Sequence, residues 1–144
     1  MLAEVEALYQ SYLDEFHRLE RKRNPMEGAL GFGVGPRNYP CHEKFAEDLE
    51  ELLTRFEAQS PASEEVGQVL NYIYFTAPAR WNSVPAVDSM LIGVHGLTLG
   101  LIPLLSPSDA RPLYDAYQAA YPRRHRLPVQ KKLLAELERR YQGR

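Results

Sequence analysis

The sequence predicts an all-α fold of about six helices packed around a central apolar helix at residues 85–102. The helices form either a helical bundle or stacked helical hairpins. Three observations support this fold class. Apolar residues recur at intervals of three and four along most of the chain. Turns containing proline and serine separate these stretches. No segment alternates as a half-buried strand would and has a partner to pair with.

Length and composition indicate one soluble domain at residues 1–144. The chain is 44% hydrophobic and 25% charged, as in ordinary globular proteins, and 144 residues is close to the commonest domain size. Cys41 is the only cysteine, so no disulfide can form within the chain. Glu4 and Glu6 stand where a secretory signal would carry basic residues, which predicts a cytoplasmic protein.

The first two helices are predicted at residues 2–22 and 40–58. In the first helix the residues expected to face inward are Val5, Leu8, Tyr9, Tyr12, Phe16 and Leu19. Asn24 and Pro25 end this helix, and Pro40 suits the first turn of the second. Between them lies a Gly-rich loop at 24–39, the longest irregular segment of the chain. Loops of this length in small domains are often functional.

The third helix is predicted at residues 63–77. Ser63 is expected to cap it, the carboxylates of Glu64 and Glu65 suit its N-terminus, and Pro78 is expected to stop it. The aromatic run at 72–75 would also suit a short strand. Because no other segment could pair with such a strand, the helix is preferred.

The fourth helix is the apolar one. Residues 90–105 carry no formal charge although the mean hydropathy of the whole chain is -0.41. This stretch is shorter than the roughly 18 to 20 residues that cross a bilayer, so we interpret it as a buried core helix that Pro103 ends or bends. Gly93, Gly96 and Gly100 each cost ~1 kcal/mol of helix propensity relative to alanine. Close approach of the backbone of another helix along this glycine edge is therefore expected.

The last two helices complete the fold. Asp109 is expected to cap the fifth helix, which ends before Pro122. Pro128 begins the sixth helix. Its apolar face consists of Val129, Leu133, Leu134, Leu137 and Tyr141.

Charge is distributed unevenly along the chain, although the formal net charge is -2. Residues 1–65 hold 14 acidic and 7 basic side chains, and residues 121–144 hold 8 basic and 2 acidic ones. A compact fold would either bring these two ends together as mutually screening surfaces or leave the basic end facing an external polyanion.

A candidate ligand site lies where the Gly-rich loop meets the second helix. Its residues are Arg37, Tyr39, Cys41 and His42. Backbone N–H groups at a helix N-terminus can bind an anion, and the same position would lower the pKa of Cys41 and make it a nucleophile. The glycine spacing matches neither a P-loop nor a dinucleotide fingerprint, so a flexible loop with an incidental cysteine is the alternative.

A second candidate surface is the basic C-terminal segment. Its residues are Arg123, Arg124, Arg126, Lys131 and Lys132, which could hold a nucleic acid or an acidic partner. Against this, the isoelectric point is near 6.1, and Glu136 and Glu138 interrupt the basic residues of the last helix. A solvated helix face, or an interface with the acidic first helices, is the alternative.

The histidines suggest no metal site and no cofactor. His17, His42, His95 and His125 include no pair at the i, i+4 spacing of helical metal ligands. His95 is interpreted as a buried histidine with one hydrogen-bond partner.

Three functions follow from these features, in order of preference. The first is a non-enzymatic protein-binding or regulatory module that acts through aromatic and charged helix faces, with a second copy of the chain as one kind of partner. The second is a small-molecule or anion-binding protein, or an enzyme, that uses the Gly-rich loop. The third is nucleic-acid binding through the basic segment.

Overall fold

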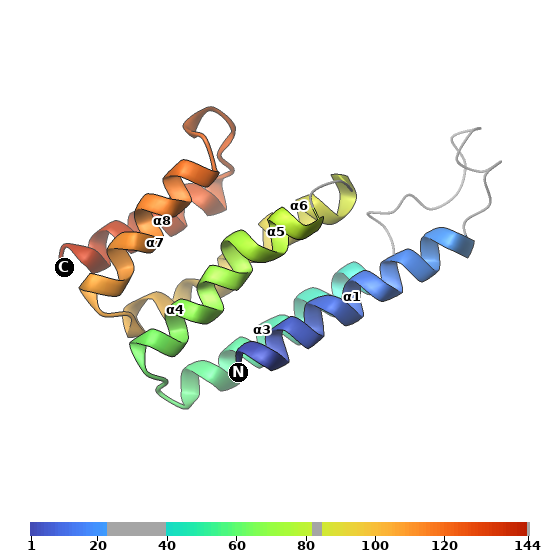
Figure 1. Cartoon of the computed structure of the whole chain (residues 1–144), viewed down its shortest axis with the longest axis horizontal. Coiled ribbons are helices and arrows are strands. Elements are labelled where there is room, and N and C mark those ends of the chain that lie inside the picture. The colour runs from blue at the N-terminus through green and yellow to red at the C-terminus, as the bar shows by residue number, and fades with distance from the viewer. Residues whose placement is uncertain (23–39, 82–84, 144) are drawn as a thin grey trace.

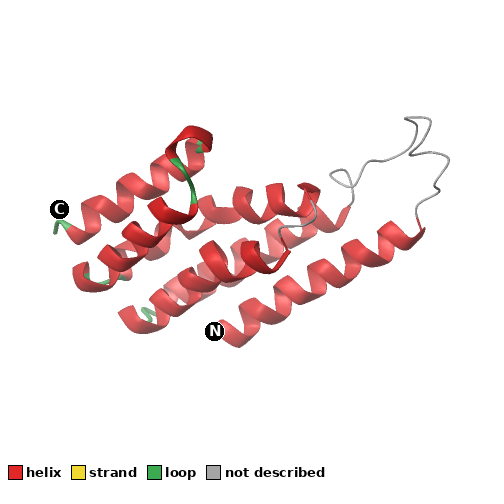
Figure 2. Cartoon of the chain, turned by 45° about the horizontal axis from the view of Figure 1, so that its top comes forward, coloured by secondary structure: helices red, strands yellow, loops and turns green. Residues whose placement is uncertain are grey.

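The computed structural model of the chain describes residues 1–22, 40–81 and 85–143. Within these ranges the chain is helical apart from short turns, and no residue lies in a strand (Figure 2). The predicted all-α fold is therefore confirmed.

The helices pair into antiparallel hairpins along the described chain. The first hairpin joins α1 (Leu2–Lys22) to α3 (Pro40–Ala58). The outgoing arm of the second is a continuous helical run, and its returning arm is apolar. The outgoing arm consists of α4 (Ser63–Asn71), a π-helical turn η2 (Tyr72–Thr76) and α5 (Ala77–Trp81). The returning arm consists of α6 (Pro85–Gly93) and a 3₁₀ helix η3 (Val94–Leu104).

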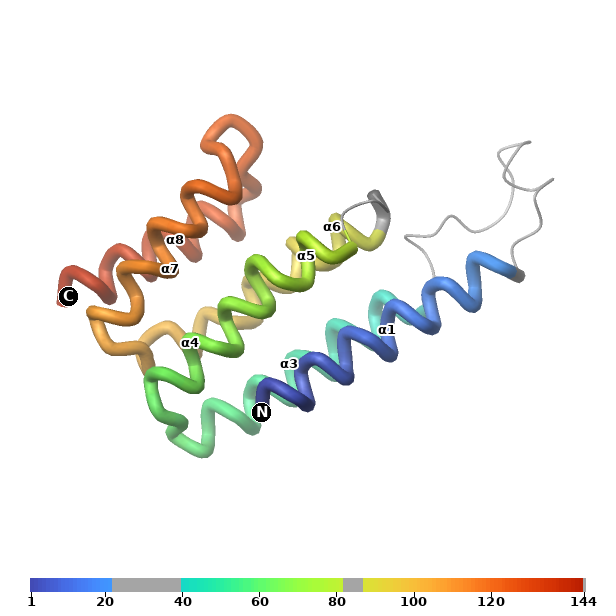
Figure 3. The backbone as a smooth tube through the Cα atoms, in the orientation of Figure 1, coloured from blue at the N-terminus to red at the C-terminus, as the bar shows by residue number. Residues whose placement is uncertain are grey.

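The third hairpin consists of α7 (Pro107–Ala120) and α8 (Pro128–Tyr141), joined by a short 3₁₀ turn η4 (Arg123–His125). The hairpins stack side by side in chain order, with the second one in the middle (Figure 1). One layer contains α1, α4–α5 and α7, and the other contains α3, α6–η3 and α8 (Figure 3). Of the two predicted arrangements, stacked hairpins describe this order better.

Buried side chains from all three hairpins form one hydrophobic cluster. Its largest fully buried members are aromatic, and they come from α1, α3, η2 and α7: Tyr9, Phe16, Phe56, Tyr74 and Tyr117. The ring of Tyr9 meets Phe45 of α3 edge to face at 4.8 Å and Tyr72 of η2 at 5.3 Å. These contacts join the first two hairpins through their rings, the geometry that aromatic pairs prefer.

The predicted central helix at residues 85–102 differs from the structure in form and in surroundings. It changes from α to 3₁₀ winding at Val94 and continues through Pro103 to Leu104. The η3 part packs against α3, α8 and α4. Leu91, His95 and Leu101 are buried, and the His95 ring contacts the rings of Tyr74 and Tyr117. Ser89, Gly93, Gly100 and Pro103 are exposed. The segment lies in the middle of its layer, but its neighbours do not enclose it.

The segment Val87–Leu104 is long and apolar enough to span a membrane by length and composition, and 39% of it is buried within the fold. A core helix of a globular protein meets the same criterion. The sequence-based expectation of a core helix outside the membrane therefore stays a prediction.

Two of the three glycines on this segment are closely approached by a neighbouring helix, but through its side chains and not through its backbone as expected. An added Cβ at Gly96 would lie 2.8 Å from Cγ2 of Val129 on α8, and one at Gly100 would lie 2.5 Å from the carboxylate of Glu57 on α3. At Gly93 the space is open, so the expectation was wrong there. Side chains, rather than the backbone of a neighbouring helix, fill the space that the missing Cβ atoms leave.

Pro78 does not stop the third helix, which was predicted to end near residue 77. The π-helical turn precedes it, with the Ala77 N–H donating to the carbonyl of Tyr72, and α5 continues to Trp81. Because Pro78 has no N–H, the carbonyl of Tyr74 loses its usual donor four residues later. The hydroxyl of Tyr121 donates to that carbonyl instead. A tertiary hydrogen bond thus compensates for the proline.

The caps of α4 and α7 also differ from the prediction. Ser106, not Asp109, caps α7, since its hydroxyl accepts the Asp109 N–H at 3.1 Å. The N-cap of α4 is Ala62, and the Ser63 hydroxyl instead accepts the Ser106 N–H at 2.7 Å and donates to the Asp109 carboxylate. These bonds tie the starts of α4 and α7 together.

Candidate functional site

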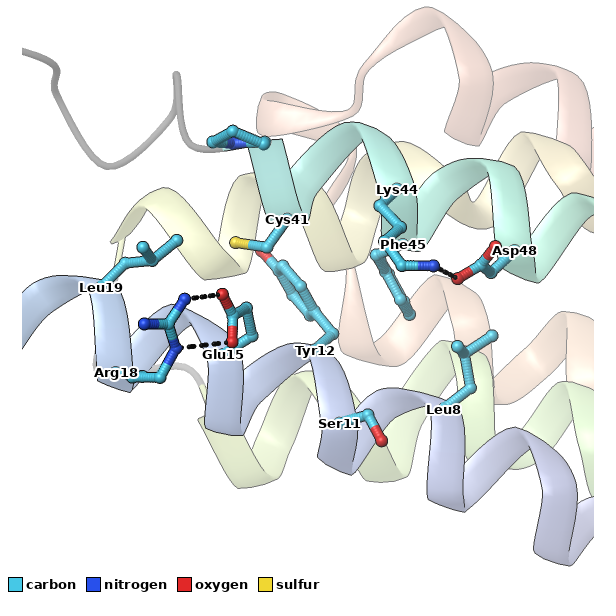
Figure 4. A pocket seen from close by; sticks show the side chains of 11 residues that line it. Leu8, Ser11, Tyr12, Glu15, Arg18, Leu19, Cys41, Lys44, Phe45 and Asp48 are labelled. Carbon is cyan, nitrogen blue, oxygen red and sulfur yellow. Dashed lines mark hydrogen bonds and ion pairs between the residues drawn. The ribbon is translucent and has the colours of Figure 1, made fainter.

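A groove runs along the outer side of the first hairpin, between α1 and α3. It has a volume of about 500 Å³. Figure 4 shows the side chains that line it, with the other two hairpins behind the pair of helices. Its floor is largely apolar, formed by Leu8, Tyr12, Leu19 and Phe45.

Leu8 and Leu19 were predicted to face the core, but both are only half-buried. They lie at the edge of the apolar stripe of α1, and the first hairpin has no described neighbour on that side. The rings of Tyr12 and Phe45 stack behind them, 4.4 Å apart and 13° from parallel. The groove therefore presents apolar side chains on a rigid aromatic support.

Ion pairs border the groove on both helices. Arg18 binds Glu15 on α1 through two hydrogen bonds, and Lys44 donates to Asp48 on α3 at 2.9 Å. These pairs are largely exposed and contribute little to stability. The helices α1 and α3 together carry 11 acidic and 5 basic side chains, so the two helices of this hairpin have a net charge of -6.

A second, smaller hollow continues the groove toward the start of α1. It has a volume of about 260 Å³ and shares Leu8 and Asp48 with the main groove. Glu4, Glu51 and Arg55 border it. From Glu4 to Leu19, α1 rises about 22 Å at 1.5 Å per residue, which is the length of a helix of four turns.

Cys41 lies in the groove in the first turn of α3, with its sulfur directed into it (Figure 4). The thiol is 7% exposed. Burial raises its pKa, and the negative charge of Glu15 raises it further. The lowered pKa expected from the helix N-terminus is therefore wrong, because desolvation outweighs the backbone hydrogen bonds.

His42 faces away from Cys41 and into the core. Its Nδ1 lies 2.6 Å from the hydroxyl of Tyr12, and its ring contacts that of Phe16. Arg37 and Tyr39, the other two predicted ligand-binding residues, lie outside the described residues. Of the four, the structure places Cys41 in a groove and His42 in the buried aromatic cluster.

The five predicted basic residues lie at the other end of the stack. Arg123, Arg124, Lys131 and Lys132 are exposed on η4 and α8. Arg126 is half-buried, and its Nε donates to the carbonyl of Tyr121 at 2.8 Å. The middle hairpin separates them from α1 and α3, so the described acidic and basic ends do not screen each other directly. Binding of a polyanion stays a prediction.

A buried polar cluster lies between the second and third hairpins. Nδ1 of His95 is 2.7 Å from the hydroxyl of Tyr117, and the hydroxyl of Tyr74 is 2.6 Å from Oγ1 of Thr98. Thr98 donates to the carbonyl of His95 at 2.7 Å. His95 is thus the predicted buried histidine with one side-chain partner.

A cleft of about 610 Å³, which the sequence did not predict, lies beside this cluster. It lies between η2, α5 and α6 on one side and the residues that join α7 to α8 on the other. Asp88, Tyr121 and Gln130 line it. Asp88 is the only carboxylate between residues 66 and 108. This isolated charge in an apolar stretch is the feature of the sequence from which the cleft could have been suspected.

Within residues 1–22, 40–81 and 85–143, no three His, Cys, Asp or Glu side chains lie close enough to hold a metal ion. Comparison with protein-family models, with curated proteins and with solved structures finds no match.

Proposed function

We propose that this chain is a non-enzymatic protein-binding module and that the groove on its first hairpin receives a basic amphipathic helix of a partner protein. The observation that supports the proposal is a groove with an apolar floor on a hairpin whose two helices have a net charge of -6. An amphipathic helix buries its apolar face in such a groove, with anchors spaced three and four residues apart.

The dimensions suit such a helix. The main groove and its smaller continuation extend along about four turns of α1. Leu8 and Leu19 would receive the apolar anchors. Lysine and arginine residues along the flanks of the partner helix would meet Glu4 and Glu51, which increases the association rate and selects against acidic helices.

A pair of synthetic peptides tests the charge preference. One is a helix of about 18 residues with leucine on one face and lysine elsewhere, and the other has glutamate in place of lysine. We expect the full-length protein to bind the lysine peptide in fluorescence anisotropy, with an affinity that falls as salt is added. Equal binding of the two peptides would contradict the proposal.

A charged substitution in the groove tests the location. Leu8→Glu places a carboxylate in the apolar floor and should weaken binding of the lysine peptide at least about tenfold, because the anchor then meets a charge. Leu127→Glu, at a residue 47% exposed on the far end of the stack, is the matched control and should leave binding unchanged. Equal affinities for the two variants would place the peptide elsewhere.

Cys41 supplies an independent readout of the same groove. Because it is the only cysteine, its reaction with a small aromatic disulfide reports on that one position. The bound lysine peptide should slow this reaction, and the glutamate peptide should not. An unchanged rate at saturating lysine peptide would show that the groove is empty.

A further inference from the structure

The cleft that the sequence did not predict has the dimensions of a small-molecule site. Its volume of about 610 Å³ falls in the range of ligand pockets, roughly 300 to 1,000 Å³. Apolar and aromatic side chains line much of it, and a few polar groups are interspersed. In such a pocket the apolar side chains contact most of the ligand, and the polar groups determine its orientation.

Asp88 is the only carboxylate among the described residues that line the cleft, and none of them is lysine or arginine. It is half-buried in the first turn of α6 and makes no hydrogen bond or ion pair in the part of the chain that the structure describes. Burial raises the pKa of this carboxyl. The helix dipole of α6 stabilises a negative charge at this position. It does not place a positively charged group in the cleft beside Asp88.

Two aromatic rings accompany this carboxylate. Phe75 and Tyr121 are both half-buried, and both line the cleft. Tyr121 is held in place because its hydroxyl donates to the carbonyl of Tyr74 and its ring lies 4.6 Å from that of Tyr117. Burial is the main cause that raises the pKa of Tyr121, and the neighbouring Tyr117 and the charge of Asp88 add to it. Asp88 and Tyr121 line the same cleft.

The opposite wall is also fixed before any ligand arrives. The side-chain oxygen of Gln130, which is 3% exposed, accepts the N–H of Leu127 at 2.9 Å. The guanidinium of Arg126 is engaged with the carbonyl of Tyr121 and does not line the cleft. His125 is the other lining residue that can carry a charge.

We propose that this cleft binds a small organic cation, with the charged group between Asp88 and the rings of Phe75 and Tyr121 and the apolar part against the rest of the lining. A carboxylate beside aromatic rings is a general solution for ammonium recognition, because Coulomb attraction and cation–π contact act on the same charge. A cationic donor compensates for the loss of water from Asp88 better than a neutral hydrogen-bond donor does. The inference is independent of the groove on the first hairpin.

Three probes of similar shape test the charge requirement: phenethylamine, its neutral analogue phenethyl alcohol, and the anion phenylacetate. Each is titrated into the full-length ¹⁵N-labelled protein and followed by backbone amide shifts. We expect the amine to bind with a Kd near or below about 1 mM and to shift residues of α6 and of the α7–α8 connection. The alcohol should bind at least about tenfold more weakly. Equal shifts for all three probes, or no shift with the amine up to about 10 mM, would overturn the proposal.

Substitutions locate the charge. Asp88→Asn keeps the shape and removes the charge, so it should reduce amine affinity about tenfold or more and leave the affinity for the alcohol unchanged. Asp115→Asn is the matched control, because Asp115 pairs with Arg111 on an exposed face of α7. Phe75→Leu should weaken binding of the amine more than binding of the alcohol, because leucine has no ring for a cation–π contact. An amine affinity unchanged by Asp88→Asn would refute the assignment, whatever the control does.

Discussion

His95 is a fully buried imidazole. One ring nitrogen meets the hydroxyl of Tyr117, and the rings of Tyr74 and Tyr121 pack against the imidazole. Nε2 has no partner at hydrogen-bond geometry among residues 1–22, 40–81 and 85–143. Burial lowers the pKa of His95 to about 4, although the nearby Ile73 carbonyl opposes the shift. The side chain is therefore neutral at pH 7 in the folded protein.

This shift predicts a pH-dependent stability. Between pH 6.5 and about 4 the unfolded chain holds a proton on His95 and the folded chain does not, so the free energy of unfolding decreases as the pH falls through this window. The His95 contribution amounts to about 2 kcal/mol between pH 7 and pH 5, measurable by urea unfolding. His95→Gln should remove this component, and His125→Gln, at an exposed site, should retain it.

A second measurement covers the case in which His95→Gln does not fold. Imidazole proton shifts of the wild-type protein report the titration of each histidine directly. The His95 resonance should remain unchanged down to about pH 5. A midpoint near 6.5 for His95 would contradict its burial as a neutral group.

At the scale of elements, the form of a helix depends in part on tertiary contacts with residues far away in the sequence. The third helix passes Pro78 because the Tyr121 hydroxyl, directly after α7, replaces the missing donor. The segment η3 winds as a 3₁₀ helix while packed between α3 and α8. The glycine edge of α6 and η3 shows the same dependence. Whether a glycine is required there depends on what faces it.

Two alanine substitutions on that edge should have opposite effects. Gly93→Ala gains helix propensity in open space and should stabilise the protein by about 0.5 to 1 kcal/mol. Gly96→Ala places a Cβ against Val129 of α8 and should destabilise it by about 1 to 3 kcal/mol, as overpacking does. Urea unfolding measures both. Equal shifts for the two variants would mean that the contact between η3 and α8 does not restrict residue 96.

For the whole molecule, the stack converts a separation of charge along the chain into a separation in space. The two helices of the first hairpin have a net charge of -6, and residues 107–141 hold 8 basic and 4 acidic side chains at the other end. The second hairpin lies between the two ends (Figure 1). A polyanion would therefore approach the basic end without strong repulsion from the acidic one.

Retention on a heparin column tests this surface. The wild-type protein should be retained although its net charge is -2, and elution should depend steeply on salt. The double variant Arg123→Glu/Arg124→Glu should elute earlier. Arg18→Glu, which reverses one charge at the acidic end, should have little effect. Elution of the wild-type protein near the starting salt concentration would show that the basic end does not bind a polyanion.

The helical segments were largely predictable, because apolar periodicity and proline positions act within a few residues. The periodicity placed α1, α3 and α8 within a few residues of their observed bounds. The candidate sites were less predictable. Cys41 was singled out for its place at a helix start, yet its surroundings on α1 determine its pKa. Leu8 and Leu19 looked like core residues, because the sequence does not show which side of a stripe lacks a neighbour.

The sequence alone determined that the chain is helical, where most helices begin and end, and that its charges are divided between its ends. Only the tertiary structure decided that α3 and α8 flank the apolar segment, that a groove opens on the first hairpin, and that Asp88 faces an aromatic cleft. The reason is physical. Helix formation depends on neighbours three and four residues away, whereas the burial of a thiol, the isolation of a carboxylate and the hydrogen bond that lets a helix pass a proline depend on residues tens of positions distant.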